Sequence, residues 1–140
     1  MNKKKYMTVG GTILLFVIII VVILLQGNKK DAWMKEVLAS EDYQITMTNC
    51  SNRTTMFPKE TIKELFNKWN QLSDNGPWTG NNNKCYPKVT ITYSKDGIVK
   101  QQEFMLIDDS SLAINSNADY WYYTNSSEIN NYLNDLFSKY

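Results

Sequence analysis

The chain has 140 residues, of which 43% are hydrophobic, 13% are aromatic and none is histidine. This length suits a single domain, and the aromatic content predicts a folded core rather than intrinsic disorder. Without histidine, a serine–histidine or cysteine–histidine nucleophile is excluded, and two cysteines cannot build a usual zinc site. We therefore expect no metal ion and no cofactor.

The chain begins with a short lysine-rich tail at residues 1–6, followed by a long apolar segment. The uninterrupted apolar run consists of Ile13, Leu14, Leu15, Phe16, Val17, Ile18, Ile19, Ile20, Val21, Val22, Ile23, Leu24 and Leu25. The uncharged stretch over residues 6–28 would form a helix about 35 Å long, enough to cross a hydrocarbon core roughly 30 Å thick. We predict a transmembrane signal anchor over residues 7–27, with the lipid bilayer as its partner.

Charges on either side of the apolar run predict its orientation. Three lysines at residues 3–5 precede the run, whereas Lys29 and Lys30 follow it beside an aspartate. The positive-inside rule therefore places residues 1–6 in the cytoplasm and the C-terminal part outside it. All fourteen acidic side chains follow the run, so the remainder of the chain carries a net charge of −2. Because no basic cluster is present there, we expect no binding to nucleic acid.

Two other roles for the apolar run compete with an anchor. The first is a cleaved signal peptide, although Leu25 to Lys29 does not contain the small residues that precede a cleavage site. The second is a pilin-like leader, because Gly11 to Ile18 loosely resembles a prepilin N-terminus. The glutamate that such helices carry five residues after the cleaved glycine is Phe16 in this chain. A leader of this kind would imply a structural, pseudopilin-like subunit of an envelope complex.

Residues 28–41 are expected to form a short helical linker or stalk, and residues 42–140 the domain itself. In the domain, Tyr43–Thr48 alternates apolar and polar side chains and predicts a first strand. Cys50 and Cys85 stand at the edges of structured segments. If the domain lies outside the cytoplasm, we expect these cysteines to form a disulfide that closes a loop of 36 residues. Two buried free thiols are the alternative.

Periodicity and turn residues predict the remaining elements. Met56 to Pro58 should open a helix, whose apolar stripe is Ile62, Leu65, Phe66, Trp69 and Leu72. A polar loop over residues 74–84 follows. Strands are expected over residues 88–93, 98–107, 112–114 and 120–123, with an Asp96–Gly97 hairpin turn between the first two. A final helix begins near Asn125, and its apolar face is Ile129, Tyr132, Leu133, Leu136, Phe137 and Tyr140.

The expected order of elements is β-α-β-β-β-β-α. Consecutive hairpins favour a mostly antiparallel sheet of about five strands, and the two amphipathic helices should cover one of its faces. We therefore predict a small α+β domain behind the single transmembrane helix.

Carboxylates are the first candidates for chemistry. Asp96, Asp108, Asp109 and Asp119 could form a cation site or an acid–base pair. Their spacing fits no calcium motif, and the string Asp108-Asp109-Ser110 is typical of a turn. We assign no catalytic residue and predict that the domain is not an enzyme. A hydrolase that works through carboxylates alone is a further alternative.

The most distinctive string is Tyr120, Trp121, Tyr122 and Tyr123. A strand sends two of these side chains to each face of the sheet. The string forms either core and a half-buried outer face, or an exposed platform for a sugar ring, a peptide or a partner protein. Trp78, in the polar loop, either packs back onto the core or stands out as an anchor. We predict binding at these five aromatic residues.

These features together predict a non-catalytic binding module on the outer side of a cell membrane, with a protein or a cell-wall component as its partner. Roles in immunity, exclusion, sensing or secretion are all compatible with this prediction. The composition, rich in lysine, asparagine and isoleucine, resembles that of membrane-anchored proteins of low-GC Gram-positive bacteria. This resemblance lies in the composition alone and not in any motif.

Overall fold

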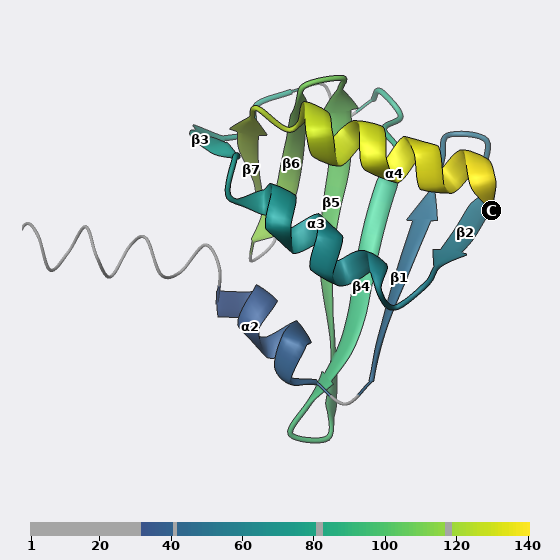
Figure 1. Cartoon of the computed structure of the whole chain (residues 1–140). Coiled ribbons are helices and arrows are strands. Elements are labelled where there is room, and N and C mark those ends of the chain that lie inside the picture. The colour runs from purple at the N-terminus through teal and green to yellow at the C-terminus, as the bar shows by residue number, and fades with distance from the viewer. Residues whose placement is uncertain (1–31, 41, 81–82, 117–118) are drawn as a thin grey trace, which may run out of the picture. The chain divides into compact units, whose positions relative to one another are not determined.

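The computed structural model describes residues 32–40, 42–80, 83–116 and 119–140 (Figure 1). The elements are α2 (Ala32–Ala39), β1 (Tyr43–Thr48), β2 (Thr54–Phe57), α3 (Thr61–Trp69), β3 (Ser73–Pro77), β4 (Lys88–Lys95), β5 (Ile98–Asp108), β6 (Ser111–Ser116), β7 (Asp119–Thr124) and α4 (Ser127–Lys139). The chain divides into two units, and the boundary between them in the sequence lies between Leu38 and Ala39. The fold described below is that of the second unit.

The predicted membrane anchor over residues 7–27 lies outside the described residues, as does the tail over residues 1–6. The described part of the expected linker contains the eight-residue helix α2. Among the described helices, none has the length and hydropathy needed to cross a membrane.

The second unit is built on one seven-stranded sheet in the order β2-β1-β4-β5-β6-β7-β3. Every neighbouring pair of strands is antiparallel. Strands β4 to β7 follow one another as a meander, with the β1–β2 hairpin at one edge and β3 at the other (Figure 1). The predicted α+β class with an antiparallel sheet is confirmed, but the prediction of about five strands was wrong, because β2 and β3 were assigned to other structures.

Strand β2 occupies residues that we expected to begin a helix. Thr55 and Phe57 are buried while Thr54 and Met56 are exposed, which is the alternation of a strand. The helix α3 begins only at Thr61, after a turn in which the Thr61 N–H donates to the carbonyl of Pro58. The apolar stripe that predicted this helix starts at Ile62, so it never required the preceding residues to be helical.

Strand β3 forms where a polar loop was expected. Its sequence, Ser-Asp-Asn-Gly-Pro, has no strand propensity of its own. Pairing with β7 supplies the missing stabilisation, and the Asn75 amide donates to the Thr124 hydroxyl at 2.7 Å. A register shift between Asp74 and Pro77, with Gly76 at a φ of 82°, bends this edge strand.

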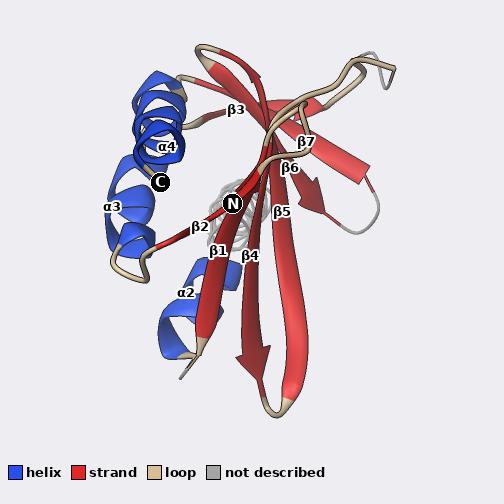
Figure 2. Ribbon diagram, turned by 90° about the vertical axis from the view of Figure 1, so that its right-hand side faces the viewer, coloured by secondary structure: helices blue, strands red, loops and turns tan. Residues whose placement is uncertain are grey.

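Helices α3 and α4 lie side by side on one face of the sheet, which we call the helix face (Figure 2). The described residues of the second unit place no helix on the opposite face, which we call the open face. The predicted stripe of α3 is buried against the sheet, and the Trp69 ring meets the Phe104 ring edge to face at 5.4 Å. From α4, Ile129, Leu133 and Phe137 are buried, whereas Tyr140 is exposed.

One buried amide fastens α4 to the turn between β5 and β6. The Asn130 side chain is 1% exposed, and its Nδ2 donates to the carbonyls of Asp108 at 2.5 Å and Ser111 at 3.2 Å. Within the turn, the Ser110 N–H donates to the Asp108 carboxylate at 2.9 Å. The predicted turn over residues 108–110 is therefore confirmed, and its carbonyls depend on a side chain from a distant helix.

Replacing Asn130 with alanine is expected to lower the free energy of unfolding by about 2–3 kcal/mol, because the part-buried carbonyl of Asp108 and the buried carbonyl of Ser111 lose their donor. Asn131→Ala is the matched control, since Asn131 is the next residue of α4 and its side chain is exposed. Urea unfolding followed by circular dichroism measures both variants. Equal stabilities of the two variants would contradict the role assigned to Asn130.

Candidate functional site

Side chains on the open face lie in rows that run across the strands. One row is formed by register partners in succession: Thr54, Thr48, Lys88, Met105, Ala113 and Tyr122. A second row contains Met56, Thr46, Thr90 and Glu103. Beyond Glu103, the pair Asn115 and Tyr120 lies on β6 and β7. The open face is thus polar over β1 and β4 and becomes aromatic towards β7.

Three aromatic rings meet at the β7 side of the open face, and we call Trp78, Tyr86 and Tyr120 the aromatic cluster. The Trp78 ring lies edge to face against Tyr86 at 5.6 Å and against Tyr120 at 6.1 Å. A backbone bond from the Trp78 N–H to the Tyr120 carbonyl, 2.8 Å long, sets this position. The three residues come from the segment after β3, the segment before β4, and β7, so only the tertiary fold brings them together.

Charged side chains border the aromatic cluster on two sides. The Tyr120 hydroxyl donates to Oε1 of Glu103, and the Lys88 ammonium lies 3.1 Å from the same oxygen. On the other side, the Lys84 ammonium lies over the Tyr86 ring, 5.9 Å from its centroid. The Glu103 carboxylate therefore has two partners, and the charges of Lys88 and Glu103 balance.

Burial, followed by the hydrogen bond to Glu103 and its negative charge, raises the pKa of Tyr120 to about 12 from 10.0. A tyrosine with a raised pKa is neutral at pH 7 and is a poor general base. In this state its hydroxyl donates to Glu103.

The raised pKa predicts an alkaline transition. Because the folded state favours the neutral phenol, Tyr120 stabilises the fold fully below pH 10 and loses this contribution as the pH rises towards about 12. Burial also raises the pKa of Tyr132, so ultraviolet titration of tyrosinate should show more than one tyrosine that ionises late, and Tyr120→Phe should remove the one with a midpoint near 12. Glu103→Gln should lower the midpoint of this tyrosine. If the tyrosine that disappears from the titration of the Tyr120→Phe variant has an ordinary pKa, the raised pKa does not belong to Tyr120.

Trp78 packs back onto the sheet. Its ring is half-buried, and a Cβ built on Gly80 would lie 2.3 Å from two carbons of the indole. The backbone of Gly80 therefore covers part of the ring, while Tyr86 and Tyr120 contact it elsewhere. Trp78 holds the segment after β3 against the open face.

Gly80→Ala is expected to displace Trp78, because a methyl group cannot share the space of the indole ring. Overpacking of this kind costs about 1–3 kcal/mol of the free energy of unfolding. Tryptophan fluorescence should shift to the red as the ring becomes solvated. Thr79→Ala is the control, since this neighbouring side chain is exposed. An unchanged spectrum for Gly80→Ala would refute the close packing.

A disulfide between Cys50 and Cys85 fixes the other end of this segment, with a Cα–Cα distance of 5.8 Å. The predicted pairing is confirmed, and the alternative of two free thiols was wrong. Cys50 lies in the β1–β2 turn, and Cys85 directly precedes Tyr86. The segment between β3 and β4 is thus attached at one end through Trp78 and at the other through the disulfide.

The structure divides the predicted aromatic string between two environments. Tyr120 and Tyr122 lie on the open face, on the same side as Trp78. Tyr123 is buried in the core on the helix face. Trp121 points to that face as well, where it is 36% exposed and donates from its Nε1 to the Asp74 carboxylate at 2.5 Å. The five predicted residues therefore do not form one surface.

Sequence analysis missed three residues of the site: Tyr86, Lys88 and Glu103. A signal existed for Tyr86, since it follows a cysteine of the predicted disulfide. Lys88 and Glu103 lie on predicted strands, but their pairing with each other and with Tyr120 depends on the strand register. The two-residue Asp96–Gly97 turn fixes the register of β4 with β5, so the Lys88–Glu103 pair could have been found from the sequence. No single turn specifies the pairing through β6 to β7 that adds Tyr120.

The aspartates considered as cation ligands are spread over separate turns. Asp96 and Gly97 have φ values of 52° and 75° and form the predicted hairpin turn. Asp108 lies in the β5–β6 turn at the other end of β5, and Asp119 begins β7. Within the described part of the chain, no group of three or more metal-binding side chains occurs.

Comparisons of this chain with protein-family models, with curated proteins and with solved structures found no match. An α+β architecture hosts many unrelated functions, so the fold class assigns none by itself. The functional argument therefore rests on the open face and its side chains.

Proposed function

We propose that the chain is a membrane-anchored, extracytoplasmic binding module without catalytic activity, and that its partner binds at the open face. The observation that carries this proposal is the aromatic cluster, which lies beside the Lys88–Glu103 ion pair on the open face, where the described residues form no helix. Aromatic side chains next to satisfied polar groups are enriched at sites where proteins bind partners.

The packing of Trp78 favours a protein over a sugar as the partner. A sugar platform needs an aromatic ring with an open face, whereas Gly80, Tyr86 and Tyr120 surround the Trp78 ring. The remaining surface is an extended array of hydroxyl, amide and paired charged groups, which suits the area and chemistry of a protein interface. Tyr122, half-buried at the end of its row, is the aromatic residue best placed at the border of that interface.

Photo-crosslinking of the full chain in its native membranes tests this proposal. A photoreactive phenylalanine analogue at position 122 should form an adduct with one protein, and the same analogue at position 131, on the exposed side of α4, should not. Adding Glu103→Lys, which replaces the ion pair with two like charges, should abolish the adduct. Absence of an adduct at position 122, together with sedimentation of the protein with purified cell walls, would replace the protein partner with a cell-wall ligand.

The N-terminus of the mature protein tests the anchor. Mass spectrometry of protein from native membranes should find the chain intact, and protease treatment of whole cells should remove residues 39–140. A new N-terminus immediately after Gly11 would support the pseudopilin-like alternative instead. A new N-terminus after the apolar run would indicate a cleaved signal peptide.

A further inference from the structure

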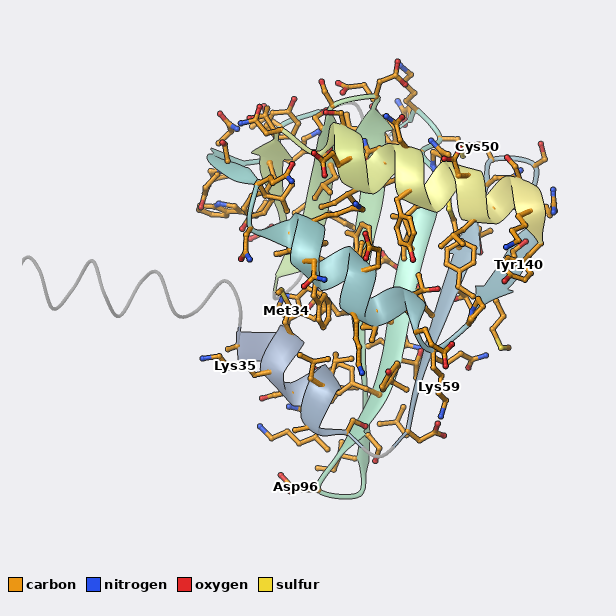
Figure 3. All side chains as sticks on the ribbon, viewed as in Figure 1. Met34, Lys35, Cys50, Lys59, Asp96 and Tyr140 are labelled. Carbon is orange, nitrogen blue, oxygen red and sulfur yellow. A yellow bond between two sulfur atoms is a disulfide. The ribbon has the colours of Figure 1, made fainter. Side chains whose placement is uncertain are left out.

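Strands β4 and β5 extend beyond the other strands as a two-stranded hairpin. The pairing of β4 with β1 ends at Tyr93, and the register of β5 with β6 begins at Phe104. Lys95 and Ile98 therefore pair with each other beyond the ends of the neighbouring strands β1 and β6. Figure 1 shows this hairpin extending from the sheet, and Asp96 marks its end in Figure 3.

The tip of this hairpin exposes two large apolar side chains. Ile98 is 64% exposed and Val99 is 70% exposed, the highest values among the large hydrophobic residues of the described chain. Lys95 pairs with Ile98 across the hairpin, Lys100 follows Val99, and the exposed Asp96 lies in the turn itself. Apolar side chains beside lysines, whose alkyl stems tolerate apolar surroundings, are typical of surfaces that lie in the interface of a lipid bilayer.

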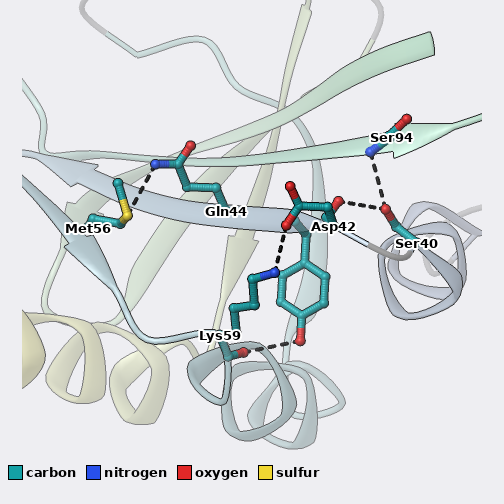
Figure 4. A network of polar contacts seen from close by, with 7 residues as sticks. Ser40, Asp42, Gln44, Met56, Lys59 and Ser94 are labelled. Atoms are coloured by element: carbon teal, nitrogen blue, oxygen red, sulfur yellow. Dashed lines mark hydrogen bonds and ion pairs between the residues drawn. The ribbon is translucent and has the colours of Figure 1, made fainter. Parts of the chain in front are cut away.

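The polypeptide enters the second unit beside this hairpin. The Ser94 N–H of β4 donates to the Ser40 hydroxyl at 3.2 Å, and that hydroxyl donates to the Asp42 carbonyl at 2.7 Å (Figure 4). The Asp42 carboxylate in turn pairs with the Lys59 ammonium at 2.6 Å. These contacts hold the first residues of the unit at the base of the hairpin.

Few residues separate this entry point from the predicted anchor in the sequence. Twelve residues, 28–39, separate the end of the predicted anchor from Ser40, and eight of them form α2. A helix of that length spans about 12 Å, and four residues at full extension add roughly 14 Å. The other end of β5, at Asp108, lies ten residues from Ile98, about 33 Å along the strand. Within the second unit, the chain therefore enters at the hairpin end of β5 and not at the end that Asp108 marks.

We propose that the tip of the β4–β5 hairpin, with Ile98 and Val99, inserts into the interface of the bilayer that holds the N-terminal anchor. This proposal rests on the membrane anchor of the proposed function. Insertion removes the two exposed side chains from water. It also gives the domain a second attachment to the bilayer, which orients the open face relative to the membrane.

Lipid quenching of a fluorophore on the full chain tests this contact. The chain has only two cysteines, and they are bonded to each other, so a cysteine introduced at position 98 can be labelled alone. The label is an environment-sensitive dye, in vesicles of phosphatidylcholine and phosphatidylglycerol that carry a quencher on the acyl chain. Asp109→Cys, in the turn at the other end of β5, is the matched control. We expect severalfold stronger quenching at position 98 than at position 109.

A second labelling site distinguishes insertion of the hairpin tip from insertion of the dye itself. With the label at Asp96→Cys, the native tip should be quenched, and the variant Ile98→Ser with Val99→Ser should not. Equal, weak quenching at positions 98 and 109, in protein that floats with the vesicles, would overturn the hairpin proposal and leave the anchor intact. Protein that does not float would overturn the anchor as well. Crosslinking between two copies at position 98 without quenching would assign the tip to a dimer and overturn the lipid contact.

Discussion

Replacing Cys50 and Cys85 together with serine is expected to lower the free energy of unfolding by about 4 kcal/mol. The disulfide restricts a loop that spans 35 positions of sequence, and the chain-entropy model gives this magnitude for a loop of such length. Domains of this size have a total stability of roughly 5–15 kcal/mol, so the loss is a large share. The segment that carries Tyr86 should also become less ordered, because Cys85 directly precedes that residue.

Chemical reduction provides the control for the disulfide. Urea unfolding of the native protein with a dithiol should reproduce the midpoint of the double serine variant, and the variant itself should not respond to the dithiol. Both cysteines are exposed, so the reductant has access to the bond. A double variant as stable as the native protein would show that hydrogen bonds and packing hold the turn and the segment together without the covalent link.

Phe104→Ala is expected to lower the free energy of unfolding by about 3–5 kcal/mol. Phe104 is 0% exposed in the middle of β5, between the sheet and α3, and its ring contacts Trp69 edge to face. Truncation removes buried apolar area and leaves a cavity that the surrounding strands cannot close. The ring pair adds a smaller contribution of about 0.5–1.5 kcal/mol, which is lost with it.

The next residue on the same strand is the control for Phe104. Met105 points to the open face and is only half-buried, so Met105→Ala should cost about 1 kcal/mol or less. Thermal unfolding of both variants measures the difference between the two faces of β5. Similar losses for the two variants would mean that the open face is packed as tightly as the core, and would weaken the assignment of that face as a binding surface.

Local sequence pattern was sufficient to predict a helix or strand wherever that element buries one of its sides. The spacing of Ile62, Leu65 and Trp69 predicted α3 and its buried face, since a helical stripe has to face the core whatever lies opposite. Alternation along Val89 and Ile91 predicted β4 in the same way. The Asp96–Gly97 turn was also predictable, because few residue pairs tolerate two positive φ values.

The candidate site was only partly predictable. Trp78 and Tyr120 were identified from their unusual local sequence, and the structure places their rings in contact. Trp121 and Tyr123 were identified by the same argument, yet they point to the helix face, because consecutive residues of a strand alternate between faces. The sequence gives this alternation but not which alternate pair faces the core.

The sequence by itself determined the amphipathic helices and the tight hairpin turn, and it left open whether the two cysteines are bonded or free. Only the tertiary structure decided the rest: that Ser73–Pro77 becomes a strand, that Tyr120 meets the Lys88–Glu103 pair, and that Ser40 meets Ser94 at the base of the hairpin. Periodicity is a property of neighbouring residues, so it reports which side of an element is buried. Strand order and register join residues far apart in the chain, and they depend on how all seven strands pack at once.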